Sequence, residues 1–118
     1  MIDMEADAWV AAIFAVETDY PHCAVGIVGD DGRALGPGQM HPPFFWEFAP
    51  EPKLGETWEQ WFHETALAFL GDARWHNDDS EQLAVRYHFG HYPWRNDEWA
   101  DAQSYLKRFR AAKAALAD

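Results

Sequence analysis

The sequence predicts a mainly helical α+β domain that carries one small β-hairpin. Several segments repeat apolar residues with helical spacing between capping or turn residues, whereas one short segment has β-branched residues beside a turn. No repeat, linker or low-complexity tract divides the 118 residues. We therefore expect residues 1–118 to form a single domain.

The first helix is expected over residues 6–17. Its apolar residues fall at positions i, i+3, i+4 and i+7, and the stripe they form consists of Trp9, Ala12, Ile13 and Val16. Pro21 disfavours helical geometry at Tyr20, so the helix is expected to end before this pair.

A short hairpin is expected over residues 24–35. The strand-forming residues of this segment are Val25, Ile27 and Val28, and Asp-Asp-Gly at residues 30–32 supplies the turn. A stretch rich in glycine and proline follows. Residues 43–48 then predict a short helix, because proline is favoured in a first helical turn.

A longer helix follows, in which Thr57 and Gln60 form a capping box and which Gly71 ends. Its apolar residues predict a wide buried stripe made of Trp58, Trp61, Phe62, Thr65 and Phe69.

Two more helices complete the expected fold. The first is capped by Asp79 or Ser80 and ended by Gly90, and the last covers residues 97–117.

Composition and charge exclude several classes of function. The net charge of −11 argues against binding to nucleic acid, which needs a basic face. A single cysteine, Cys23, permits no internal disulfide. The N-terminal segment lacks the basic start of a secretory signal, and no segment approaches the roughly 18 apolar residues of a membrane span. We therefore expect cytoplasmic synthesis without a signal peptide.

Glu17 is the main catalytic candidate, because it ends the first helix just before a glycine-rich loop. Unsatisfied carbonyl groups at a helix end and neighbouring apolar side chains both disfavour a charged carboxylate. A carboxyl group that stays protonated near neutral pH is a general acid, which suits protonation of a glycosidic oxygen. The alternative is a solvated carboxylate at a helix end.

Three ordered blocks of the sequence, the first of which consists of two successive segments, resemble the lysozyme-like fold of soluble lytic transglycosylases and phage muramidases. In VETDYPHCAVG, Glu17 is followed seven and eight residues later by Ala24 and Val25. GRALGPGQMHP carries the Gly-x-x-Gln segment at residues 36–39. AVRYHFG and DAQSYLKRF resemble the family's Ala-x-Tyr-Asn-x-Gly and Glu-Thr-x-x-Tyr-Val helices, and together the blocks extend over residues 10–109.

The resemblance implies a hairpin beside a saccharide cleft and a peptidoglycan glycosidase that cuts the β-1,4 bond between N-acetylmuramic acid and N-acetylglucosamine. Glu17 would be its general acid. The residues expected to contact the glycan strand are Gln39, Tyr87, Gly90 and Tyr105, the tyrosines as aromatic walls or hydroxyl donors. No cofactor is expected.

The chain also departs from the family pattern. Thr18 and Asp19 replace the usual Ser-Gly after the acid, and His88 replaces the usual Asn. These departures leave open a catalytically inactive saccharide-binding or virion structural module on the same fold. The resemblance also suggests a phage lysis or virion-associated protein, which would reach the cell wall through a holin or by delivery from the phage particle.

The sequence leaves two mechanisms open. Hydrolysis usually needs two carboxylates, about 5–5.5 Å apart for retention and about 6.5–9.5 Å for inversion. Asp30 or Asp31 at the hairpin tip could supply the second, although Asp-Asp-Gly is equally explained as a turn. Lytic transglycosylases instead use one glutamate while the muramyl C6 hydroxyl attacks. Hydrolysis, with Asp30, is slightly preferred.

Two weaker patterns predict no site. His88 and His91 have i, i+3 spacing, with His63 and His76 elsewhere, but a zinc site needs three or four converging ligands, so no metal is expected. Cys23 follows His22 directly, and adjacent loop residues rarely point together as a nucleophile and base would.

Overall fold

The computed structural model describes residues 4–90 and 96–117. That part of the chain is mainly helical with one small two-stranded antiparallel sheet, as predicted. Its α-helices are α1 (Ala6–Thr18), α2 (Pro42–Phe48), α3 (Trp58–Leu70), α4 (Ser80–Phe89) and α5 (Asn96–Ala117). The shorter elements are the strands β1 (Val28–Gly29) and β2 (Ala34–Leu35) and the 3-10 helices η1 (Asp30–Gly32) and η2 (Ala73–Trp75).

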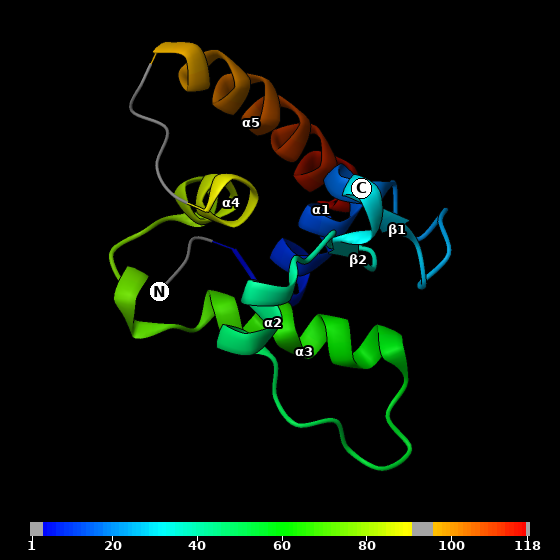
Figure 1. The fold of residues 1–118 in the computed structure, drawn as a ribbon. Helices are drawn as coiled ribbons and strands as arrows, with labels where there is room; N and C mark the ends of the chain where they lie inside the picture. Colours follow the sequence, from blue (N-terminus) through cyan, green and yellow to red (C-terminus); the bar gives the residue numbers. More distant parts are fainter. Residues whose placement is uncertain (1–3, 91–95, 118) are drawn as a thin grey trace.

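Helix α1 lies at the centre of the fold (Figure 1). It packs against α5 on one side and α3 on the other, while α4 packs on α5 and α2 packs on α3. The predicted apolar stripe explains this position, since Trp9, Ala12 and Ile13 are fully buried and Val16 packs at the edge of the core. Helices α3, α4 and α5 contribute further large buried side chains, which include Phe62, Phe69, Leu83, Tyr105 and Phe109.

The predicted helix ends are confirmed. Thr57 and Gln60 form the capping box of α3, and Asp79, one of the two expected residues, forms another with Gln82 at the start of α4. Gly90 ends α4 with φ 80°, a left-handed conformation that glycine adopts without strain.

The hairpin is shorter than predicted. Only Val28–Gly29 pairs with Ala34–Leu35, so Val25 and Ile27 lie outside the strands. The tip is also wound differently, because η1 replaces a simple turn and both Asp30 and Asp31 have positive φ (51° and 55°). Aspartate tolerates this left-handed geometry better than most residues.

The predicted buried stripe of α3 is wrong at one position. Phe62, Thr65 and Phe69 are buried and Trp61 is half-buried, but Trp58 is 69% exposed. It is the first residue of the helix, and its ring lies edge-on to the ring of Trp61 and tilted against the ring of Phe62. Among the described residues, no helix has the length and apolar character needed to span a membrane.

Candidate active site

Glu17 lies in the last turn of α1, which contacts the glycine-rich segment that follows the hairpin. The helix ends because Asp19 adopts φ 59° and its N–H bonds the Ala15 carbonyl at 2.9 Å. The Thr18 hydroxyl donates to the Pro37 carbonyl at 2.8 Å. This bond fixes the Glu17 backbone against the glycine-rich segment, and the Glu17 side chain is 10% exposed.

Side chains from two other helices meet one oxygen of Glu17. The Tyr105 hydroxyl of α5 donates to Oε2 at 2.8 Å, and His88 Nδ1 of α4 lies 2.8 Å from the same oxygen. Among the described residues, Oε1 has no hydrogen-bond partner. The carboxyl group is therefore held at one oxygen and available at the other.

The two predicted tyrosines have different partners. Tyr105 contacts Glu17 directly, whereas the Tyr87 hydroxyl donates to the Gly38 carbonyl at 2.6 Å. Burial raises the pKa of both phenols well above the usual value, and the nearby Glu17 carboxylate raises each further. Both side chains thus remain neutral hydroxyl donors across the physiological pH range.

The Gly-x-x-Gln segment forms the wall next to Glu17. A Cβ on Gly38 would lie 2.3 Å from the Tyr87 hydroxyl oxygen, so only glycine lets that backbone approach the phenol. Gln39 has φ 50°, and its Nε2 donates to the Gly36 carbonyl at 3.0 Å. This internal bond fixes the amide of Gln39 at the edge of the site.

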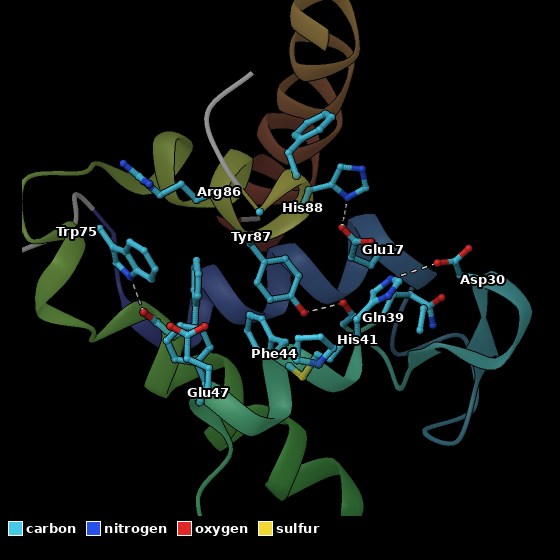
Figure 2. Close-up of a pocket in the computed structure, with 18 of the residues that line it drawn as sticks. Glu17, Asp30, Gln39, His41, Phe44, Glu47, Trp75, Arg86, Tyr87 and His88 are labelled. Carbon is cyan, nitrogen blue, oxygen red and sulfur yellow. Dashed lines mark hydrogen bonds and ion pairs between the residues drawn. The ribbon is translucent and has the colours of Figure 1, made fainter. Parts of the chain in front are cut away.

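These residues line a cleft of about 710 Å3. Figure 2 shows Glu17, His88, Gln39, Asp30 and His41 at one end, and Trp75, Arg86 and Glu47 at the other, with Tyr87 and Phe44 between them. Of the predicted substrate-binding residues, Gln39, Tyr87 and Gly90 line this cleft. Tyr105 is not part of the lining; it is 1% exposed and reaches the cleft only through its bond to Glu17.

Asp30 and Asp31 are separated by the geometry of the hairpin tip. Asp30 lines the cleft, where Oδ2 lies 3.4 Å from His41 Nε2 and Oδ1 lies 3.7 Å from an Arg33 guanidinium nitrogen. Asp31 is exposed and is not among the lining residues. Of these two aspartates, Asp30 therefore shares the cleft with Glu17 and Asp31 does not.

The far end of the cleft was not predicted from the sequence. The Trp75 indole donates to the Phe69 carbonyl at 2.7 Å, and the guanidinium carbons of Arg74 and Arg86 lie 4.7 and 5.4 Å from its ring centre. Glu47 pairs with Arg74. Trp75 belongs to η2, a single turn too short to leave a periodic pattern in the sequence.

The structure also places residues of the two weaker patterns, Cys23 and the histidines. Cys23 donates to the Thr18 hydroxyl at 3.3 Å. His91 lies outside the described residues, and within them no group of three His, Cys, Asp or Glu residues is placed to hold a metal ion. The contact of His88 with Glu17 was not predicted. Its one signal in the sequence was that histidine stands where the family pattern has asparagine.

No family model, curated protein or solved structure matches this chain, so its own geometry carries the functional argument.

Proposed function

We propose that this chain is a peptidoglycan glycosidase with a lysozyme-like fold, in which Glu17 is the general acid that protonates the glycosidic oxygen. One observation carries the proposal. Glu17 is a carboxyl group 10% exposed at a cleft of about 710 Å3, and two hydrogen-bond partners, Tyr105 and His88, hold one of its oxygens.

The hydrogen bonds at Glu17 suit a carboxyl group that first donates a proton as a general acid and then accepts one as a general base. A general acid or base works when its reacting oxygen is fixed within hydrogen-bond reach of the substrate. Tyr105 and His88 fix Oε2, so Oε1 is the oxygen that would exchange a proton with the glycosidic oxygen and then with the attacking nucleophile.

The cleft supports a saccharide substrate. Its volume falls within the range of about 300–1,000 Å3 for ligand pockets. Aromatic rings of Phe44, Tyr87 and Trp75 and polar groups such as Gln39 both line it. Sugars offer apolar ring faces and hydroxyl groups, so both kinds of lining have a counterpart on a glycan strand.

Asp30 supports hydrolysis over transglycosylation, because it lines the same cleft as Glu17 and Asp31 does not. A second carboxylate would activate water or act as nucleophile and leave reducing ends. Mass spectrometry of released muropeptides distinguishes the two products, since a 1,6-anhydro end lacks one water. Anhydro products from a fully active Asp30→Asn variant would exclude a catalytic role for Asp30.

A second candidate is a saccharide-binding or virion structural module that has no catalytic activity. The net charge of −11 favours it, because an acidic enzyme is not steered towards an anionic wall. Incubating the wild-type protein with purified peptidoglycan separates the two. The proposed glycosidase clears the suspension and releases muropeptides, whereas a binding module sediments with the wall and releases none.

A further inference from the structure

We propose that the start of α3 is a docking surface for a partner protein, which binds it through a segment that combines lysine or arginine with apolar side chains. The surface consists of Leu54, of Trp58 and of a pocket between α1 and α3, and none of these lines the cleft that holds Glu17. Binding of such a partner is independent of the proposed catalytic role of Glu17.

The pocket has a volume of about 250 Å3 and two unlike walls. The wall formed by α1 and the residues after it is apolar and consists of Ala11, Phe14 and Tyr20. The wall formed by α3 is polar and includes Glu59, His63 and Glu64. An aliphatic chain that ends in a cation matches both walls, because its methylene groups can face the rings while its charge faces the carboxylates.

The negative charge at this surface is only partly neutralised by the chain itself. Residues 51–64 contain four glutamates and one lysine, Lys53. Lys53 Nζ lies 3.2 Å from Glu64 Oε1. Among the described residues, no basic side chain forms an ion pair with Glu59. A lysine or arginine of a partner would supply that pair.

Two other titratable side chains of the pocket do not alter this balance. His63 Nε2 lies 2.8 Å from Asp7 Oδ1, so a positive charge on the His63 ring would be offset by the aspartate. Burial and then a hydrogen bond with Glu59 raise the pKa of Tyr20 to about 12, so its phenol is neutral at physiological pH. The pocket therefore keeps the negative character that Glu59 and Glu64 give it.

The apolar part of the surface is exposed and yet held in place. Leu54 is fully exposed in the loop that joins α2 to α3, and Trp58 at the end of this loop is largely exposed (Figure 1). The Trp61 indole donates to the Pro50 carbonyl at 2.9 Å, and the capping box of α3 fixes the other end of the loop. A surface that is ordered before binding loses little conformational entropy when a partner docks.

Charge and apolar exposure together select the occupant. Trp58 directly precedes Glu59 in the first turn of α3, so the exposed ring adjoins the acidic wall of the pocket. An anionic membrane, or a second copy of this chain with its net charge of −11, would be repelled. A polyamine would satisfy the glutamates but has no apolar side chain for Leu54 and Trp58. A protein segment in which basic and apolar residues alternate supplies both.

The test uses a short amphipathic peptide of leucine and lysine as the probe, and the same peptide with glutamate in place of lysine as its counterpart. Isothermal titration calorimetry with the full chain at about 0.15 M salt should detect binding of the first peptide and not of the second. Trp58→Ser and Glu59→Gln should each raise Kd about fivefold or more. Both side chains are exposed, so circular dichroism should show an unchanged fold.

Two variants on α5 are the matched controls. Trp99→Ser and Asp101→Asn change an exposed tryptophan and an exposed carboxylate that do not line the pocket, and should leave Kd unchanged. Nitrogen-15 NMR of the indole N–H groups locates the probe, because the Trp58 signal should shift on addition of the leucine–lysine peptide while the Trp99 signal stays in place.

Four results would overturn the proposal. Equal weakening by the α5 variants would mean a general attraction between opposite charges. No binding of the leucine–lysine peptide at millimolar concentration, or equal binding of the leucine–glutamate peptide, would exclude a basic partner. Soluble peptidoglycan fragments that shift the Trp58 indole signal, when the peptide does not, would make this surface a saccharide site instead.

Discussion

Replacing Tyr105 with phenylalanine removes one hydroxyl group from the interior and leaves the ring that stacks on His88. The hydroxyl is bonded to Glu17 at 2.8 Å, and Tyr105 is 1% exposed. A buried hydrogen bond contributes about 0.5–1.5 kcal/mol when its partner is neutral and about 1.5–3 kcal/mol when its partner is charged, so Tyr105→Phe should lose about 0.5–3 kcal/mol of the free energy of unfolding at pH 7. Tyr87→Phe loses a bond to a neutral carbonyl and should cost only about 0.5–1.5 kcal/mol.

The same variant should change the alkaline limb of the stability curve. Burial and then the Glu17 carboxylate raise the pKa of Tyr105, so the folded state keeps a proton that the unfolded chain releases. This contribution is complete below about pH 10 and is lost as the pH rises towards the folded-state pKa. One tyrosine contributes a slope of about 1.4 kcal/mol per pH unit in that range.

Urea unfolding followed by circular dichroism between pH 7 and pH 11 measures both effects. Tyr105→Phe should unfold more easily at pH 7 and lose stability less steeply above pH 10 than the wild type. The variant should still lose some stability above pH 10, because two other tyrosines also titrate there. Burial raises the pKa of Tyr20 to about 12 and raises the pKa of Tyr87 well above the usual value. Equal stability at pH 7 together with an unchanged alkaline slope would refute a buried phenol bonded to Glu17.

Two further substitutions test the parts that hold the cleft. Gly38→Ala should destabilise the fold by about 2–4 kcal/mol, because its Cβ would lie 2.3 Å from the Tyr87 hydroxyl oxygen. Gly26→Ala is the control, because a Cβ at Gly26 would have nothing within 4 Å. Equal melting temperatures of the two variants would contradict the close approach of Gly38 to Tyr87. Thr57→Ala should lower the free energy of unfolding by about 1 kcal/mol, because it removes the side-chain acceptor of the Gln60 N–H. Thermal unfolding measures this change, and an unchanged stability would mean that the capping box does not stabilise α3.

Local chemistry made much of this fold predictable. The capping box at Thr57 needs only residues three apart, and the stop at Gly90 needs only one residue that accepts positive φ. The burial of Trp9 followed from helical spacing alone. Such features depend on neighbours in the sequence.

Other features depended on packing that the sequence does not display. Val25 and Ile27 have strand propensity, yet the pairing of the hairpin stops at Val28 and Leu35. Trp58 is apolar but is the first residue of α3, where it stays 69% exposed beside Trp61 and Phe62. In both cases tertiary context overrides a local preference.

The candidate site shows the same division. The position of Glu17 at a helix end was predicted, because that is a local property. The bonds from His88 and Tyr105 bridge 71 and 88 positions of sequence, so no spacing rule could reveal them. Trp75 was missed for the separate reason that η2 is a single turn.

The most direct measurement of the central claim is the rate of peptidoglycan clearing by Glu17→Gln. Glutamine keeps the size of the side chain and an acceptor for Tyr105 and His88 but has no transferable proton. The account predicts a loss of at least about 100-fold with the fold intact by circular dichroism. Glu64→Gln, which removes a carboxylate that pairs with Lys53 outside the cleft, should keep the wild-type rate. Clearing by Glu17→Gln at the wild-type rate would contradict the assignment of Glu17 as the general acid.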